Sequence, residues 1–496
     1  MPGIICVARF CMSLDILLVN PPLTLAERYG AFASVGSQAP PLGLCYLAAA
    51  VRKAGHRAGI LDAPALNLDL PATVREVGGT RAALIGITAT TASIIRAAEL
   101  AQGLRAGGVR SPIVIGGAHV SALPEQTLRE FPEFDLGVIN EGEHTIVEVI
   151  EANKSGSSYH DIRGVVFRDR DDITMTPARA LIENLDELPF PAWDLIPDLA
   201  KHYKPAPHSY FQLPSSSLMT SRGCNGTCTF CARPFMGERY RSNSPEYTLA
   251  MVDHLVRQYG IRDIMFYDDN FLLDRGRVLK ICDALLSRDY RISWSCLART
   301  DLTPKDFYET IHRAGCWQIA YGIESGDQEI LNNMKKHVKI DRVVQMIQQA
   351  NNAGITTRGY FMIGCPGETP ATIEKTIDFM RDSKLKEFHV TFCTPMPGAE
   401  LFDSWRKWGA FDCDWRKLGF WDPVFIPHGM TREELIAGHR RMFRKFYLRP
   451  AVIARYVLKV IRKPCIMLNI LRAGWDVLKY SMTGYVKHKL KTVRHG

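Results

Sequence analysis

Residues 221–231 read Ser-Arg-Gly-Cys-Asn-Gly-Thr-Cys-Thr-Phe-Cys, which sets the thiols of Cys224, Cys228 and Cys231 four and three residues apart. Soft thiolate ligands select iron–sulfur clusters or zinc. A structural zinc site takes a fourth Cys or His, and no such residue follows at motif spacing. Three thiolates hold three corners of a cubane cluster and leave its fourth iron open. The triplet therefore predicts an iron–sulfur cluster, with a zinc site or buried thiols as the alternative.

Strand-like and helical stretches alternate around the triplet. Strand candidates lie at Leu218–Thr220, Asp263–Tyr267, Ser293–Leu297, Gln318–Ile323, Thr357–Ile363 and His389–Thr394. Short apolar runs separated by helical segments are typical of parallel βα units. Six such units predict a partial parallel (βα)6 barrel over residues 215–400, and ligands of such barrels bind at the carboxyl ends of the strands.

The C-x3-C-x2-C spacing, with an aromatic residue just before the last cysteine, resembles the radical S-adenosylmethionine superfamily. The resemblance covers about Leu218 to Pro397. In that family the open iron binds the amino and carboxylate groups of S-adenosylmethionine, and an electron from the cluster cleaves its C–S bond to give a 5′-deoxyadenosyl radical. The resemblance implies a 4Fe-4S cluster on Cys224, Cys228 and Cys231.

Three later motifs are similar to the cofactor contacts of this superfamily. Residues 266–271 resemble the second-strand segment that approaches the methionyl amino group, although the usual Gly-Gly-Glu is absent. Residues 322–326 resemble the ribose-contacting stretch, and residues 359–368 the fifth-strand motif that borders adenine. The resemblance implies S-adenosylmethionine contacts at Asp268, Asp269, Asn270, Glu324, Ser325, Ile363 and Gly364.

The first 150 residues predict a second α/β unit. Strand candidates at Ile16–Val19, Ala58–Asp62, Ala83–Thr88, Ile113–Gly117 and Leu136–Ile139 alternate with helical stretches such as Leu42–Ala54 and Ser93–Ala106. This rhythm is typical of a doubly wound, Rossmann- or flavodoxin-like parallel sheet. Ligands of such sheets bind at the carboxyl ends of the strands, where Thr, Gly and Pro gather in this sequence.

Motifs in residues 14–150 resemble the cobalamin-binding domains that precede some radical S-adenosylmethionine barrels. They are Asn20-Pro21-Pro22, Pro40–Leu47, Ala54-Gly55-His56, Gly116–His119 and Asn140–Glu143. Glycines at a strand end let the backbone approach a bulky ligand, and threonine hydroxyls can bind its nucleotide tail. The resemblance implies cobalamin contacts at Thr88, Thr90, Gly116, Gly117 and Glu141. The alternative is a flavodoxin-like module without cobalamin.

The Asp-x-His-x-x-Gly signature that supplies a lower-face histidine to cobalt in other cobalamin proteins is missing. Cobalt would then be bound without that histidine. His56 precedes a strand candidate and His119 follows one, so each is expected to be an ordinary surface or structural histidine rather than a cobalt ligand.

The remaining segments are predicted to be a proline-rich linker over residues 151–214 and a mostly helical, basic region over residues 401–496. From Arg440 onward there are 15 Lys or Arg and one acid, within a chain of net charge +9. Basic amphipathic helices can lie on an anionic bilayer, which suits a lipid substrate and contact with the inner face of the membrane. The alternative, slightly favoured, is a helical cap packed over the barrel.

Thirteen scattered cysteines fit a reducing cytoplasm, and no membrane-spanning run or secretion signal is found.

Within this subfamily, a radical abstracts hydrogen from an unactivated carbon and methylcobalamin delivers a methyl group. The resemblance implies a 4Fe-4S cluster, S-adenosylmethionine and cobalamin as cofactors, and a natural-product, lipid or tetrapyrrole-like substrate. It also implies a reducing partner such as a flavodoxin or a ferredoxin, and no nucleic acid. The alternatives are a radical cyclase or oxidoreductase without methyl transfer and a corrinoid-binding sensor. An RNA-modifying methylthiotransferase is disfavoured because residues 14–150 contain only Cys45, whereas those enzymes carry three further cluster cysteines there.

Overall fold

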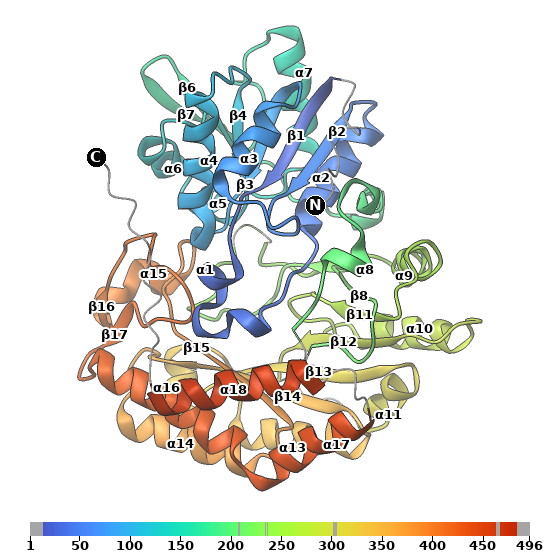
Figure 1. Cartoon of the computed structure of the whole chain (residues 1–496), viewed down its shortest axis with the longest axis vertical. Helices are drawn as coiled ribbons and strands as arrows, with labels where there is room; N and C mark the ends of the chain where they lie inside the picture. The colour runs from blue at the N-terminus through green and yellow to red at the C-terminus, as the bar shows by residue number, and fades with distance from the viewer. Residues whose placement is uncertain are drawn as a thin grey trace.

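Two parallel sheets, one in each half of the chain, organise the molecule (Figure 1). The computed structural model describes residues 13–206, 209–233, 235, 237–300, 305–462 and 467–483. Both predicted α/β units are present, together with a C-terminal helical region, so the predicted fold class is confirmed. The last part of the predicted basic region, residues 484–496, lies outside the described residues.

The first sheet has the strand order β2-β1-β3-β4-β5-β6-β7, and its first five strands are parallel. The order changes direction between β1 and β3, which makes the carboxyl ends of these two strands the switch point where open α/β sheets bind ligands. The five strands match the predicted positions within two residues. Their bounds are β1 Leu14–Asn20, β2 Ala58–Asp62, β3 Ala82–Thr88, β4 Ile113–Gly116 and β5 Leu136–Val138.

Helices cover both faces of this sheet, because alternate strand residues point to opposite sides. Ile16 and Leu18 of β1 pack in one core and Leu17 and Val19 in another. The helices are α2 Leu42–Lys53 and α7 Glu143–Ser155 on the first side, α3 Leu70–Gly78 and α4 Ile94–Ala106 on the second, with the short α5 Ala118–Ala122 and α6 Pro124–Glu130.

An antiparallel hairpin extends this sheet at one edge. Strand β6 (Val165–Asp169) pairs antiparallel with β5, and β7 (Asp172–Met175) pairs antiparallel with β6. The turn between them carries Arg170 at a positive φ of 57°. The segment expected to act as a linker, residues 151–214, therefore begins with a part of the sheet, because the short strands carry too few residues to show a clear periodicity.

The second sheet has the order β15-β14-β13-β12-β11-β8, and all its strand pairs are parallel. All six predicted strands are found in their predicted order, which confirms the partial barrel. The strands are β8 Ser215–Leu218, β11 Asp263–Phe266, β12 Ser293–Ala298, β13 Cys316–Glu324, β14 Thr356–Ile363 and β15 Glu387–Phe392. The helices between them are α9 Pro245–Tyr259, α10 Arg275–Leu286, α11 Lys305–Arg313, α12 Gln328–Asn333, α13 Ile340–Asn352 and α14 Pro370–Asp382.

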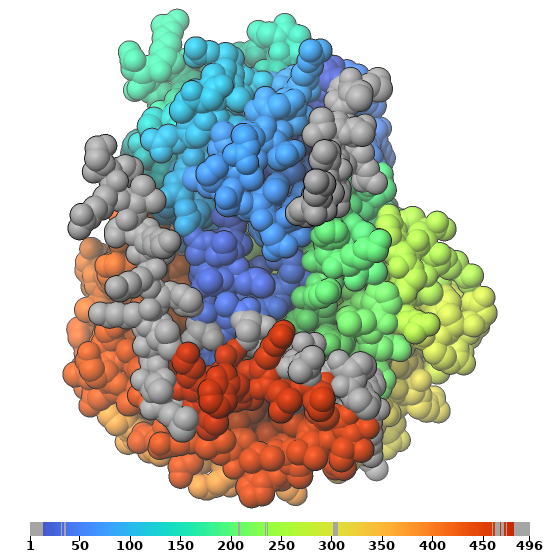
Figure 2. All heavy atoms as spheres, in the orientation of Figure 1, coloured from blue at the N-terminus to red at the C-terminus, as the bar shows by residue number. Residues whose placement is uncertain are grey.

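The C-terminal helices α16 (Arg432–Tyr447), α17 (Pro450–Arg462) and α18 (Met467–Thr483) lie over the open side of the barrel. The Tyr480 hydroxyl on α18 lies 2.6 Å from Nδ1 of His439 on α16, and its ring lies 5.1 Å from that of Phe32. Phe32 belongs to η2 (Gly30–Val35), which follows α1 (Leu25–Tyr29) after β1. In Figure 2 the red surface of α18 lies just below the blue N-terminal segment. None of the helices in the described part of the chain is long and apolar enough to cross a bilayer.

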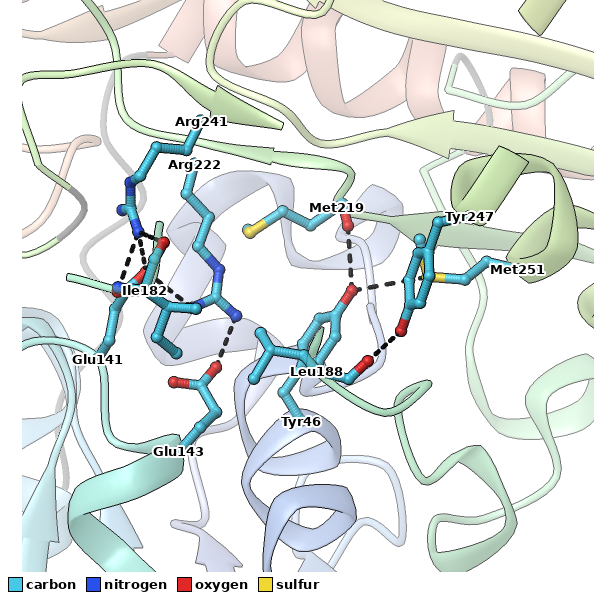
Figure 3. Close-up of polar contacts among 10 residues, drawn as sticks. All are labelled: Tyr46, Glu141, Glu143, Ile182, Leu188, Met219, Arg222, Arg241, Tyr247 and Met251. Atoms are coloured by element: carbon cyan, nitrogen blue, oxygen red, sulfur yellow. Dashed lines mark hydrogen bonds and ion pairs between the residues drawn. The ribbon is translucent and has the colours of Figure 1, made fainter. Parts of the chain in front are cut away.

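A buried ion-pair network joins the two α/β units (Figure 3). Glu141, just before α7, accepts from Arg222 at 2.8 Å and from Arg241 at 3.0 Å, and Glu143, the first residue of α7, accepts from Arg222 at 2.6 Å. Their side chains are at most 7% exposed. The backbone N–H of Ile182 donates to Glu141 at 2.7 Å. Arg222 and Arg241 lie in β9 (Ser221–Arg222) and β10 (Arg241–Ser242), the small hairpin that flanks the cysteine loop. The network therefore fixes this loop relative to the first sheet.

Replacing Glu141 by Ala should lower the free energy of unfolding by about 3–5 kcal/mol, because two buried guanidinium groups lose their shared counter-charge. Urea unfolding followed by tryptophan fluorescence measures the loss. The matched control is Glu125→Ala, which removes the exposed pair between Glu125 and Arg129 and should change stability by less than about 1 kcal/mol. Equal effects of the two substitutions would show that the network does not stabilise the fold.

Candidate cofactor and substrate site

A cavity of about 1090 Å³ lies where the two α/β units and the C-terminal helices meet. Cys224, Cys228 and Cys231 line one part of it. Tyr29 and Phe32, from the segment that follows β1, line it from the side of the first sheet, and α17 and α18 supply a third wall. The upper range for pockets that hold one drug-sized ligand is about 1,000 Å³. The cavity is therefore large enough for more than one small molecule.

The cysteine loop faces this cavity between β9 and β10. The backbone N–H of Gly226 donates to Sγ of Cys224 at 3.4 Å, and Nη1 of Arg299 donates to Sγ of Cys228 at 3.5 Å. A Cβ on Gly226 would lie 2.4 Å from that Arg299 nitrogen, so a larger residue there would displace the Arg299 guanidinium from the cysteine loop. Among the described residues no three Cys, His, Asp or Glu side chains converge on one metal ion. A cubane needs no such convergence, since each thiolate binds a different iron. The loop thus fits the predicted cluster.

Asp269 and Glu324 are the two predicted S-adenosylmethionine contacts that line the cavity. Burial, followed by the charge of Asp268, raises the pKa of Asp269. Glu324 ends β13 with a left-handed φ of 69° and pairs with Nζ of Lys336 at 2.7 Å. A Cβ on Gly322 would lie 2.6 Å from Oε1 of Glu324, so a larger residue there would displace this carboxylate. The two carboxylates can bind the hydroxyl and ammonium groups of a ligand.

Three other predicted contacts make hydrogen bonds inside the protein and do not line the cavity. Asp268 accepts from the backbone N–H and the hydroxyl of Thr220, both at 2.6 Å. Asn270 accepts from the N–H of Arg299 at 3.2 Å. The Ser325 hydroxyl lies 3.2 Å from that of Thr376. Asp268 and Asn270 thus hold the loops around the cavity from behind, and Ser325 ties β13 to α14.

The two predicted contacts at the end of β14 also lie behind the cavity wall. Ile363 packs against Gly438 of α16. Gly364 has a φ of 82°, and its N–H donates to the carboxylate of Glu368. The same carboxylate accepts from the N–H of Cys365 at 3.0 Å. These contacts shape the turn after β14 that the sequence motif marks.

The predicted cobalamin contacts gather at the carboxyl edge of the first sheet, with one exception. Thr88 ends β3, Thr90 caps the 3-10 turn η3 (Thr91–Ser93), and Gly116 ends β4. Gly117 has a φ of 103°, and a Cβ there would lie 2.6 Å from the carbonyl oxygen of Ala89. Gly116 is open, because no other atom lies within 4 Å of the place that a Cβ would take. None of these four residues lines the cavity, and the open space at Gly116 leaves room for a ligand to approach the backbone at this edge.

The exception, Glu141, lies after β5 but directs its carboxylate to Arg222, Arg241 and the N–H of Ile182. The observed contacts give it the role of an ion-pair partner between the two units.

Neither histidine considered as a cobalt ligand lines the cavity. His119 is 1% exposed, its Nδ1 lies 3.3 Å from the Thr91 hydroxyl, and burial lowers its pKa to about 4. Its ring packs edge-on against that of Trp415 at 5.2 Å. His56 lies 3.3 Å from Nζ of Lys154 on the outer side of α7. Both have the surroundings of structural or surface histidines.

Several cavity residues were not singled out from the sequence. Lys336 and Arg299 carry positive charge beside the cysteines, and Arg358, Tyr360 and His389 line the part formed by β14 and β15. An isolated Lys or Arg carries no local motif, because its position in the cavity depends on pairing between distant strands. Arg358 and Tyr360 lie two residues apart on β14 and therefore on the same face of the sheet. This alternation was the one feature of the sequence that could have predicted their place in the cavity.

Comparison with known proteins identifies the family of the two α/β units. The family model described as "Radical SAM superfamily" matches residues 218–380, and that described as "B12 binding domain" matches residues 30–150. An uncharacterized methyltransferase of Pyrococcus horikoshii is 32% identical over 448 residues, covering 90% of this chain and 95% of that protein. The chain belongs to the cobalamin-binding radical S-adenosylmethionine enzymes.

Two further comparisons show the range of this family. The anaerobic magnesium-protoporphyrin IX monomethyl ester cyclase of Cereibacter sphaeroides is 26% identical, with 85% of this chain and 69% of that protein covered. The structure of the radical S-adenosylmethionine methyltransferase TsrM from Kitasatospora setae, with cobalamin and a [4Fe-4S] cluster bound, matches with a TM-score of 0.64. It covers 79% of this chain and 74% of that one at 19% identity, and so supports the fold.

The turn after β14 predicts a pH dependence of stability. Burial raises the pKa of Glu368 from 4.5 to about 7. Because the folded pKa lies above the unfolded value, this group makes the protein less stable as the pH rises from about 4.5 through 7, by on the order of 3 kcal/mol. Glu368→Gln keeps an oxygen acceptor for Gly364 and Cys365 and removes the charge. The variant should therefore gain stability over the wild type at pH 8 but not at pH 4.5, as measured by urea unfolding. An equal difference at both pH values would contradict the assignment.

Proposed function

We propose that this enzyme transfers a methyl group to an unactivated carbon of a small or lipid-like molecule. The observation that carries the proposal is the shared cavity. The segment after β1, at the switch point of the first sheet, and the cysteine loop of the barrel line the same space. Cofactors bound at these two places would face one substrate. The methyltransferase name of the relative from Pyrococcus horikoshii, which matches nearly the whole chain, supports the same reaction.

In this proposal Cys224, Cys228 and Cys231 hold a 4Fe-4S cluster, and Asp269 and Glu324 bind S-adenosylmethionine beside it. The carboxyl edge formed by Thr88, Thr90, Gly116 and Gly117 holds cobalamin, without a histidine ligand from the protein. When bound, these groups supply a 5′-deoxyadenosyl radical for hydrogen abstraction and a methyl group for transfer.

The protein's own contribution is positioning and charge. Lys336 pairs with Glu324 and holds its carboxylate in place, and the buried network of Arg222 keeps the cysteine loop opposite the first sheet. The aromatic side chains of Phe32, Trp421 and Phe443 line the cavity and exclude water from a reactive radical.

Ring closure without methyl transfer is the second candidate function. The relatives named anaerobic magnesium-protoporphyrin IX monomethyl ester cyclase cover 85% of this chain, which favours this alternative over a non-enzymatic corrinoid sensor. A small reducing protein such as a flavodoxin or a ferredoxin would supply the electron in either case, in the cytoplasm. Contact of the basic C-terminal region with a membrane stays a prediction.

The cluster assignment predicts that Cys224→Ala, Cys228→Ala and Cys231→Ala each abolish reductive cleavage of S-adenosylmethionine, because two thiolates hold a cubane poorly. The protein is purified without oxygen and reconstituted with iron, sulfide and hydroxocobalamin. The wild type should hold about four iron and about one cobalt per chain, whereas the variants should lose iron and keep cobalt. Cys413→Ala, at an exposed cysteine outside the cavity, is the matched control. Cleavage retained by any triplet variant would overturn the assignment, and iron without cobalt in the wild type would remove the corrinoid from the proposal.

Methyl transfer itself is tested with S-adenosylmethionine labelled in its methyl group, a chemical reductant and an extract of cells that contain the enzyme. Label in a product, together with S-adenosylhomocysteine and 5′-deoxyadenosine, is the expected result. Formation of 5′-deoxyadenosine and an unlabelled product would favour the cyclase instead.

A further inference from the structure

A buried cation lies in the cavity wall away from the cysteines. Arg358 of β14 is 2% exposed and lines the cavity. Its Nη1 donates to the hydroxyl of Ser209 at 3.2 Å. Its neighbour on β15 is Glu387, whose carboxylate accepts from the Tyr456 hydroxyl at 2.8 Å. A guanidinium group is rarely buried unless it binds other polar or charged groups, because its desolvation is costly.

His389, Tyr447 and Tyr456, near Arg358, are uncharged at pH 7, whereas Glu387 on β15 supplies a carboxylate that does not line the cavity. Burial, followed by the charge of Arg358, lowers the pKa of His389 to about 4, and burial raises the pKa values of Tyr447 and Tyr456. The rings of Tyr360 and His389 meet edge-on at 5.3 Å. Arg358 is therefore the positively charged group in this part of the cavity lining, with hydrogen-bonding groups of Tyr360 and His389 beside it. A guanidinium in this setting fits a carboxylate or phosphate group.

The adjoining wall is apolar and open. Val457 and Ile461 of α17 and Leu471 and Trp475 of α18 line the cavity, yet they are 51%, 67%, 59% and 64% exposed. Covering the exposed part of these side chains is favourable because apolar surface is removed from water. Apolar side chains that line a cavity and stay uncovered favour an apolar ligand. The wall formed by α17 and α18 thus complements a hydrocarbon body.

We propose that Arg358 binds the oxyanion, a carboxylate or a phosphate, of an elongated and largely apolar substrate. The inference rests on the proposed function, since it names the substrate class of that same cavity. Ala320, the register partner of Arg358, precedes Glu324 by four residues on β13, which is about 13 Å along the strand. The carbon that reacts beside Glu324 is therefore on the order of ten ångströms from the oxyanion.

The test compares three probes of equal chain length: hexadecanoic acid, hexadecyl phosphate and hexadecanol. Their binding to the reconstituted full-length protein is measured without oxygen by titration calorimetry. At least one of the two anionic probes should bind roughly 10- to 100-fold more tightly than the alcohol, the range expected for a charge-assisted hydrogen-bonded pair. The tighter of the two identifies the headgroup.

Two variants and one control locate this preference. Arg358→Gln should bind all three probes with the affinity of the alcohol. Arg358→Lys keeps the positive charge and should retain part of the preference for the anionic probes. Retention in Arg358→Lys shows that the loss in Arg358→Gln is not caused by misfolding. Arg472→Gln, at an exposed position of α18 outside the cavity lining, should behave as the wild type. Equal binding of all probes by the wild type, or an unchanged preference in Arg358→Gln, would overturn the proposal.

Reductive cleavage of S-adenosylmethionine by the wild type, measured without any amphiphile, separates this proposal from the proposed function. Absence of cleavage counts against the radical reaction. The anion preference is read from binding alone, so it stands or falls independently.

Discussion

The buried contact between Arg222 and the two carboxylates of Glu141 and Glu143 is the constraint on which the site depends. Removing charged groups from water is costly, so this contact persists only where both units meet with close geometry. Arg222 lies two residues before the first cysteine of the loop, Glu141 lies in the loop after β5, and Glu143 begins α7. One set of charges therefore decides how far the carboxyl edge of the first sheet lies from the cysteine loop. Tyr46, beneath the Arg222 guanidinium at 5.4 Å, connects α2 to the same contact.

Strand positions were predictable because parallel strands buried on both faces are short apolar runs bounded by Gly, Pro and Thr. The eleven strand candidates lie in the two sheets in the expected chain order, and β2 has the predicted bounds. The hairpin β6–β7 was missed because its residues alternate weakly, as in Arg168 and Asp172 at an exposed edge. Strand order between distant segments follows from the preference for right-handed crossovers rather than from any local signal.

The candidate site was predictable to the extent that it is local in sequence. Cys224, Cys228 and Cys231 share one loop, and Gly117 marks a backbone position that excludes a side chain. The roles of Asp268 and Glu141 could not be predicted from the sequence. A carboxylate in a motif looks the same in the sequence whether it faces a ligand or a group inside the protein. Arg358 lines the cavity because β14 pairs with β13, and Lys336 because of the turn after α12. No residue close to either of them in the sequence indicates that they line a cavity.

The cavity wall that contacts the proposed hydrocarbon comes from one continuous stretch at the end of the chain, α17 and α18, whereas the cysteine loop and the corrinoid edge come from earlier segments. In the proposal, the apolar wall of the substrate site and the cysteine loop are thus encoded in separate parts of the gene, whereas Arg358 belongs to the barrel. If the proposed function is right, exchange of these two helices between related enzymes should alter the hydrocarbon that fits the cavity while the sequence of the cysteine loop stays unchanged. This separation gives an evolutionary route by which a single catalytic framework acquires new substrates.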